Sequence, residues 1–196
     1  MGYSIDSFTD SCYEGTTCLI NKFGITDEQK LAELEGRITF AKASVLERNP
    51  LEGNFDFSHY KAIHRFLFED IYDWAGDVRK VNISKKGTVF VPADEIETIA
   101  EVCFGRLSDE NLFLNLCRTK YIEQITDFYC VTNTLHPFRE GNGRTQRIFI
   151  SQLVRHAGYN IDFYNVDIDE LMIATIQAAN GIMDNLIKIF DRLITD

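Results

Sequence analysis

Residues 135–149, LHPFREGNGRTQRIF, decide both the fold and the chemistry of this chain of 196 residues. They place one histidine, a Gly-Asn-Gly turn and three arginines in a protein whose formal net charge is -10. From His136 to Arg147, three arginines stand against one glutamate, so the local charge is 3 - 1 = +2. A positive segment in an acidic chain indicates a confined anion site, because general nucleic-acid binding needs an extended positive surface.

The Gly-Asn-Gly turn predicts the start of a helix whose first N–H groups point toward a bound anion. Arg144 and Arg147 are three residues apart and therefore share one face of that helix. Their planar guanidinium groups match phosphate oxygens, and Asn142 can hydrogen-bond the same group. Together these residues predict a polyphosphate site.

Three more residues of the segment have the chemistry of a transfer site. His136 is predicted to end the preceding helix, where a neutral imidazole with a pKa of about 6.5 can accept a proton from a hydroxyl group. Glu140 is placed to hold Mg²⁺ against phosphate oxygens. Phe138 alternates with polar residues, so we expect its ring to anchor the loop in the core. The alternative is a capped helix–loop–helix with solvated arginines, which does not require this combination of residues.

Helix signals dominate the rest of the chain, which has the length of one domain over residues 1–196. We expect a short helix over residues 16–24, and then a long helix that opens with a capping box from Thr26 to Gln29. Another helix starts at Ser58 and is closed by Gly76. Further helices are expected at about 93–107, 110–136, 143–156, 167–180 and 183–194. The long helix has a predicted apolar stripe of Leu31, Leu34, Ile38, Ala41 and Val45.

The helical pattern breaks at residues 77–92, where β-forming residues flank the sequence SKKG. This arrangement predicts a small hairpin at about 80–91. The predicted fold class is therefore all-α with one short β-hairpin.

Several locations and ligand classes are disfavoured by composition. No apolar run approaches the roughly 20 residues of a membrane span, and the first residues lack the pattern of a secretory signal. The five cysteines have no zinc-site spacing and are typical of reduced thiols in a cytosolic protein. We expect a cytoplasmic protein that binds neither nucleic acid nor membrane directly.

The segment HPFREGNGRTQR matches the motif HxFx(D/E)GNGRxxR at every position, and the chain thereby resembles the Fic family. The resemblance extends to YEGTTCLINKFGI, FLFEDIYDWAGDVR and ISKKGTVF, which lie outside the motif. It implies an all-α enzyme that uses ATP and Mg²⁺ and transfers AMP to a protein hydroxyl, with release of pyrophosphate.

The resemblance also implies a role for each residue of the motif, at positions 136–147. His136 would deprotonate the target Tyr, Ser or Thr hydroxyl, and Glu140 would bind Mg²⁺ at the α- and β-phosphates. Arg144 would hold the β-phosphate and Arg147 the γ-phosphate. The anion hole would consist of Gly141, Asn142 and Gly143.

In the family the hairpin acts as a flap that covers the nucleotide and pairs with an extended target segment as an added strand. The matching flap residues are Ile83, Ser84, Lys85, Lys86, Gly87, Thr88 and Val89. A plain surface hairpin is the alternative interpretation.

Many Fic proteins are inhibited by a glutamate in the pattern (S/T)xxxE(G/N), which pairs with the second motif arginine. Here Glu14, Glu35 and Glu52 precede a glycine, but none has Ser or Thr four residues earlier. We therefore expect a separate small antitoxin to supply the inhibitory helix, as in the bacterial Fic toxin–antitoxin class. That class implies the ATPase subunits of DNA gyrase and topoisomerase IV as targets.

Other functions remain open at this stage. Doc-type relatives carry Lys in place of the second motif glycine and act as kinases, whereas Gly143 favours AMP transfer. UMP or phosphocholine transfer, removal of AMP, and a non-catalytic module that docks peptides through the hairpin are further alternatives. His59, His64 and His156 lie outside the motif and are predicted to be surface or helix-end residues.

Overall fold

The computed structural model describes residues 4–5, 11–85 and 88–196, so the flap residues Lys86 and Gly87 lie outside the described part. Seven α-helices and two short 3-10 helices occupy most of this part, which confirms the predicted all-α class. The α-helices are α1 (Glu28–Arg48), α2 (Phe57–Phe68), α3 (Ile96–Asp109), α4 (Arg118–Leu135), α5 (Asn142–His156), α6 (Ile168–Ala179) and α7 (Asp184–Leu193). The 3-10 helices are η1 (Asn111–Phe113) and η2 (Phe163–Asn165).

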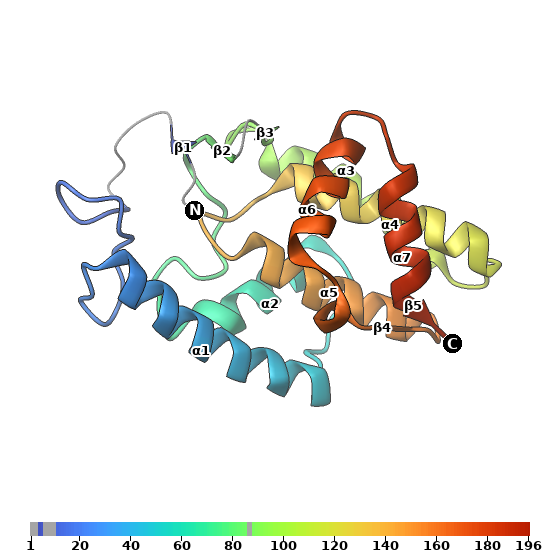
Figure 1. Ribbon diagram of the computed structural model, residues 1–196, viewed down its shortest axis with the longest axis horizontal. Coiled ribbons are helices and arrows are strands. Elements are labelled where there is room, and N and C mark those ends of the chain that lie inside the picture. Colours follow the sequence, from blue (N-terminus) through green and yellow to red (C-terminus); the bar gives the residue numbers. More distant parts are fainter. Residues whose placement is uncertain (1–3, 6–10, 86–87) are drawn as a thin grey trace.

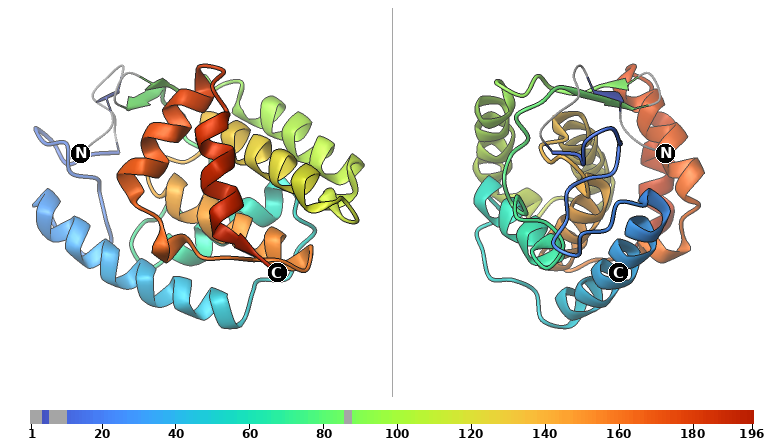
Figure 2. Two further views of the ribbon diagram at one scale, coloured as in Figure 1. Left: turned by 45° about the vertical axis from the view of Figure 1, so that its right-hand side comes forward. Right: turned by 90° about the vertical axis from the view of Figure 1, so that its left-hand side faces the viewer.

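Helix α5 lies at the centre of the molecule and packs against α1, α2 and α4, while α6 and α7 pack on α4 (Figures 1 and 2). Ten of its fifteen residues are buried, and they are spread around the helix rather than along one stripe. A helix that is buried on most sides belongs to the interior of a domain. The predicted catalytic segment is therefore built on the most enclosed helix of the fold.

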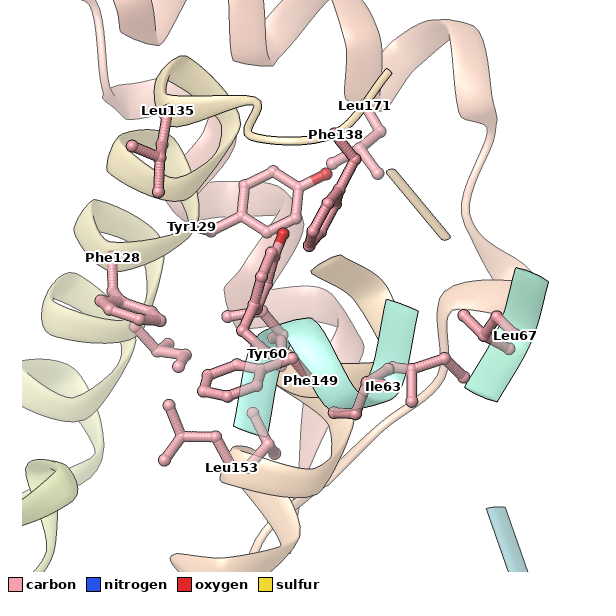
Figure 3. Packing of buried hydrophobic residues seen from close by; sticks show 14 of the residues in the cluster. Tyr60, Ile63, Leu67, Phe128, Tyr129, Leu135, Phe138, Phe149, Leu153 and Leu171 are labelled. Carbon is pink, nitrogen blue, oxygen red and sulfur yellow. The ribbon is translucent and has the colours of Figure 1, made fainter. Parts of the chain in front are cut away.

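The core beneath the motif is aromatic (Figure 3). Tyr60 of α2 stacks on Phe138 of the motif loop with ring centroids 5.7 Å apart, and it meets Phe149 of α5 edge to face at 5.3 Å. Tyr129 of α4 lies beside them in the same cluster. Large rings in contact bury much apolar surface and resist shear, so they give the motif loop a stiff base.

Two small antiparallel sheets complete the fold. In the first, β2 (Ile83–Lys85) and β3 (Thr88–Val89) form the predicted hairpin, with Lys85 opposite Thr88. The N-terminal strand β1 (Ser4–Ile5) adds to β2 on the side away from β3. In the second, β4 (Asn160–Ile161) pairs with β5 (Ile194–Thr195) after α7. One edge of the hairpin is thus already covered by the chain itself.

The helix predicted over residues 16–24 is wrong. This segment is irregular, with an isolated bridge between Cys12 and Leu19. The buried Asn21 side chain donates to Ile25 O at 2.7 Å and accepts from Ile25 N at 3.1 Å. An asparagine that satisfies nearby backbone groups in this way stabilises a turn at the expense of a helix.

The predicted face of α1 is also wrong in part. Its buried residues are Leu31, Glu35, Thr39 and Leu46, whereas Val45 of the expected apolar stripe is 47% exposed. Helix α1 is capped by Asp27, whose side chain accepts from the N–H groups of Gln29 and Lys30, and not by Thr26. The stripe was misplaced because α1 turns two polar residues, Glu35 and Thr39, toward the interior.

Two other helix boundaries differ from the prediction. Helix α2 ends at Phe68 and is followed by turns, so Gly76 does not close it. The helix expected over 110–136 begins only at Arg118, because Asn111, Leu112 and Phe113 have positive φ angles and form η1. None of the helices in the described ranges has the length and apolar content that a bilayer span requires.

Candidate active site

The motif loop connects α4 to α5 through two residues in left-handed conformation. Helix α4 ends at Leu135 and is capped by His136, which has φ 43°, and α5 begins after Gly141, which has φ 80°. A left-handed residue is easy for glycine and costs about 1–3 kcal/mol for histidine. The backbone at His136 is therefore strained and must be held in place by its surroundings.

Asn142 closes the loop with two buried hydrogen bonds to one residue. Its Oδ1 accepts from the N–H of Phe138 at 2.8 Å, and its Nδ2 donates to the carbonyl of Phe138 at 2.8 Å. Both residues are buried. Both polar atoms of the Asn142 side chain are thus used within the loop. Of the contributions expected from Asn142 to the anion hole, only that of its backbone N–H remains.

His64 of α2 supports the same loop from below. The Gly76 N–H donates to His64 Nδ1 at 2.8 Å, which places the proton on Nε2, and Nε2 donates to the Glu140 carbonyl at 3.0 Å. The imidazole stacks on Phe138 at 3.8 Å. Burial is the main cause that lowers the pKa of His64 to about 3, so the ring stays neutral. His64 is fully buried, and its prediction as a surface or helix-end residue is wrong.

His136 presents a defined basic nitrogen. Its Nδ1 lies 3.0 Å from the carbonyl of Asn133, which can only accept, so Nδ1 carries the proton and Nε2 carries the lone pair. Phe90, just after β3, stacks on the imidazole at 3.7 Å. Burial, with smaller contributions from Lys85 and Arg79, lowers the pKa of His136 to about 3. The imidazole is therefore neutral at physiological pH, as a proton acceptor must be.

Arg79 joins the hairpin to this histidine. Its Nε donates to the His136 carbonyl at 2.9 Å, and its backbone N–H donates to the Pro137 carbonyl at 2.9 Å. The same guanidinium donates to the carbonyls of Val81 and Val91, which flank the hairpin on its two sides. Arg79 is only 4% exposed. One buried cation thus holds the strained residue and both ends of the flap.

Arg144 lies between two carboxylates. It forms an ion pair with Glu35 of α1 and a longer one, at 3.4 Å, with Glu140. Its other terminal nitrogen donates to Thr39 Oγ1 at 3.2 Å, and the guanidinium lies 4.8 Å above the Phe68 ring. Glu140 also accepts from the Gly141 N–H at 2.7 Å.

Arg147 differs from Arg144 in its surroundings. Within the described ranges no carboxylate lies at ion-pair distance from it. Burial lowers its pKa, and the neighbouring Arg144 acts in the same direction, but a guanidinium remains charged in proteins. Two neighbouring arginines, one of them without an acidic partner in the described part of the chain, favour the binding of an anion.

A cavity of about 280 Å³ brings these groups together. The motif contributes His136, Glu140, Gly141, Gly143, Arg144 and Arg147. The hairpin side contributes Lys85, Thr88 and Phe90, and α6 contributes the apolar residues Met172 and Ile176 among others. Arg139, the third arginine of the motif, points elsewhere and donates to Ser11 Oγ at 3.3 Å. The cavity therefore has a cationic end, a basic histidine and an apolar wall.

Three residues of the site were missed by the sequence interpretation: Glu35, His64 and Arg79. Glu35 and Thr39 are four residues apart on one face of α1, and a polar pair on a core-facing stripe is a signal for a buried site. His64 lies one residue after Ile63, inside the apolar face of α2. For Arg79 no local pattern exists, because its partners come from positions 81, 91, 136 and 137.

Comparisons with known proteins identify the family of this chain. A family model described as Fic/DOC family matches residues 54–154. A protein adenylyltransferase from Bartonella schoenbuchensis, VbhT, is 36% identical over 98% of this chain, which spans 40% of that relative. A probable protein adenylyltransferase Fic from Salmonella typhimurium is 35% identical over 94% of this chain and 91% of its own length.

Among solved structures, BepC from Bartonella tribocorum with bound AMPPNP superposes with a TM-score of 0.87. It is 27% identical, and the match covers 94% of this chain and 96% of that one. The chain belongs to the Fic/DOC family, whose curated relatives include the two protein adenylyltransferases above.

Gly141→Ala tests the close approach of the loop to α2. A Cβ at Gly141 would lie 2.2 Å from the Phe68 ring, and the φ of 80° is unfavourable for alanine. Gly158→Ala is the matched control, because Gly158 has φ 87° and open space around it. We expect urea unfolding to show a loss for Gly141→Ala that exceeds the loss for Gly158→Ala by about 2 kcal/mol. Equal losses would mean that contact with Phe68 is unimportant.

His64→Gln tests the buried neutral imidazole. In the unfolded chain His64 titrates at about 6.5, but in the native protein only near 3, so acid protonates the unfolded state first. Stability therefore falls as the pH drops below about 6.5. Between pH 7.5 and 5.5 we expect His64 to account for about 1.4 kcal/mol of that loss. Urea unfolding at both pH values should show a smaller loss in His64→Gln; an unchanged loss would exclude this role.

Proposed function

We propose that the chain is a protein adenylyltransferase, which transfers AMP from ATP to a Tyr, Ser or Thr hydroxyl of a target protein. The observation that carries the proposal is the pair of motif arginines that line one cavity, with Arg147 half-buried and without an acidic partner in the described residues. A polyphosphate chain supplies the missing negative charge. The names of the curated relatives and the AMPPNP in the BepC structure support the same conclusion.

The geometry supports one assignment of roles. His136 Nε2 takes the proton of the target hydroxyl, whose oxygen attacks the α-phosphorus while the bond from that phosphorus to the leaving oxygen breaks. Pyrophosphate leaves, and AMP remains on the target. The N–H groups of Asn142 and Gly143 would bind phosphate at the start of α5, where helix geometry leaves them without intrahelical partners. The Gly141 N–H, which here donates to the Glu140 carboxylate, would join them once Glu140 holds Mg²⁺. Arg144 holds the β-phosphate and Arg147 the γ-phosphate.

The apolar wall of the cavity suits the nucleoside. Met172, Ile176 and Ala179 of α6 line the same cavity as the two arginines. A flat purine gains from contact with apolar side chains, while the phosphates need the cationic end. The position of α6 therefore supports a nucleotide oriented with its phosphates toward α5.

Mg²⁺ fits the residues present through Glu140. Among the described residues no cluster of three metal-ligating side chains occurs, which agrees with the preference of Mg²⁺ for one or two carboxylates together with substrate phosphates and water. When bound there, Mg²⁺ would neutralise charge on the phosphates. Glu140 would bind the ion and would give up its 3.4 Å contact with Arg144.

We propose that the target docks on the hairpin as an added strand. Thr88 and Val89 of β3 form the edge opposite to the one that β1 covers, and Val89 is 76% exposed. An exposed strand edge offers unpaired backbone groups to an extended segment. Of the other flap residues, Ile83 is buried and supports the hairpin from beneath.

A small antitoxin that supplies a glutamate-bearing helix is the regulation that we propose. Two observations support it. Arg147 lacks a carboxylate in the described part of the chain, and a second cavity, of about 530 Å³, opens between α1 and η2 with Arg144 and Arg147 in its wall. Phe40 and Tyr164 at this cavity are 62% and 70% exposed and offer apolar contact to a partner helix.

Kinase activity is the competing assignment within the family, and Gly143 bears on it. A Cβ at position 143 would lie 3.2 Å from a terminal nitrogen of Arg147. A longer side chain would therefore press on the arginine that is assigned to the γ-phosphate. The glycine supports a site in which Arg147 is free to bind phosphate.

Intact-mass spectrometry tests the transferred group and the target together. The chain is incubated with Mg²⁺ and ATP and with the ATPase subunits of DNA gyrase or topoisomerase IV, alongside His136→Ala. We expect an AMP-sized gain on a subunit that falls at least about 100-fold in rate in the variant. A phosphate-sized gain would identify a kinase. Labelling of other proteins or of the chain itself would keep the chemistry and exclude the proposed targets.

The antitoxin proposal has its own test. A candidate antitoxin with the (S/T)xxxE(G/N) pattern is added to the labelling reaction, with its Glu→Ala variant as the control. We expect suppression by the first and at least about tenfold recovery with the second, because the loss of one buried charged partner costs about 1.5–3 kcal/mol. Equal suppression by both would show that the glutamate is not the inhibitory group.

A further inference from the structure

Helix α1 places a carboxylate against Arg144, one of the two arginines that line the cavity. Glu35 forms an ion pair with Arg144, and the Glu35 side chain is only 9% exposed. Its second oxygen accepts from the hydroxyl of Tyr72, which is itself 1% exposed. Both oxygens of Glu35 thus have a partner: one pairs with Arg144 and the other accepts from Tyr72. These contacts offset the cost of burying the charge.

The contacts of Arg144 distinguish Glu35 from Glu140. Glu140 lies 3.4 Å from the guanidinium, lines the cavity and is the carboxylate assigned to Mg²⁺. Glu35 does not line that cavity, and it contacts the same terminal nitrogen of Arg144 as Glu140 does, while Thr39 accepts from the other terminal nitrogen. When Glu140 turns to the metal, Glu35 and Thr39 still hold the arginine.

The remaining donors of Arg144 fit a phosphate. A guanidinium has five N–H groups in a rigid plane. Three are used by Glu35, Glu140 and Thr39, so two are left for a ligand, and a third is released when Glu140 moves. Stacking over Phe68 fixes the plane of the group. The guanidinium is therefore oriented before any ligand arrives, which lowers the entropy cost of binding.

We propose that Glu35 is a positioning residue for nucleotide binding: it holds Arg144 in the orientation that receives the β-phosphate. The inference rests on the proposed function, because it assumes that a nucleotide occupies the cavity. Glu35 acts through Arg144 and does not itself touch the ligand. Its contribution is therefore specific for nucleotides that have a β-phosphate.

The test measures nucleotide affinity by calorimetry, without any transfer step. AMPPNP, ADP and AMP are titrated into the unmodified chain and into Glu35→Gln, which keeps the side-chain volume and the contact with Tyr72. We expect AMPPNP and ADP to bind about tenfold more weakly to Glu35→Gln, the effect of losing about 1.4 kcal/mol, while AMP binds equally to both.

The matched control is Glu47→Gln. Glu47 Oε2 and Arg155 form another ion pair between α1 and α5, at 2.6 Å, away from the motif. Its loss removes a helix–helix ion pair without touching Arg144, so we expect all three affinities to stay within about twofold of the unmodified chain. Thermal unfolding of both variants checks that each is folded at the temperature of the titration.

The outcomes separate the two proposals. If the unmodified chain binds neither AMPPNP nor ADP, the proposed function fails. If it binds them and Glu35→Gln binds them equally well, only the role of Glu35 fails. Tighter binding by Glu35→Gln would overturn the proposal by showing that Glu35 competes with phosphate for Arg144. A parallel loss for AMP, or an equal loss in Glu47→Gln, would identify a structural role alone.

Discussion

The paired hydrogen bonds between Asn142 and Phe138 are the constraint on which the site depends. They close the five-residue segment from Phe138 to Asn142 around one buried amide. The closure fixes the direction in which α5 begins, and with it the direction of the N–H groups and both cavity arginines. Without the Asn142 side chain the N–H and carbonyl of Phe138 would be buried without these partners, at a cost of about 1–3 kcal/mol each. The Asn142 side chain therefore has a structural role, the closure of the loop, that does not depend on a bound ligand.

Groups from outside the motif act on that closed loop through its backbone and its arginine. His64 of α2 bonds to the Glu140 carbonyl, Arg79 bonds to the His136 and Pro137 carbonyls, and Glu35 of α1 bonds to Arg144. Each comes from a different segment, so the loop is held from several directions at once. This support explains how a histidine at φ 43° can persist in the native state. The strain lies at the residue with the basic nitrogen, where a fixed orientation matters most.

The sequence was informative wherever the required chemistry is local. The helix start after Gly141, the histidine at the end of α4 and the hairpin around residues 83–89 follow from glycines, caps and β-formers within a few residues. It was misleading where a polar residue faces inward. Glu35 and Thr39 interrupt the apolar stripe of α1, so a prediction based on hydropathy placed the buried face on the wrong side of the helix. Asn21 stabilises a loop where the sequence predicted a helix. Arg79 combines distant carbonyls, which only the folded chain brings together.

Arg79 also bears on how such proteins can diversify. It recognises the hairpin through the carbonyls of Val81 and Val91, which are backbone groups that any amino acid supplies. The residues between these two points can therefore be exchanged without loss of these two hydrogen bonds, although Phe90 among them also stacks on His136. Under the proposed function, selection for new targets can act on exposed hairpin residues such as Val89 while Arg79 keeps its hydrogen bond to the His136 carbonyl. In this architecture, hairpin residues that would contact a target can change independently of the backbone around His136. Arg79 joins the two regions through backbone carbonyls, which do not depend on the sequence of the hairpin.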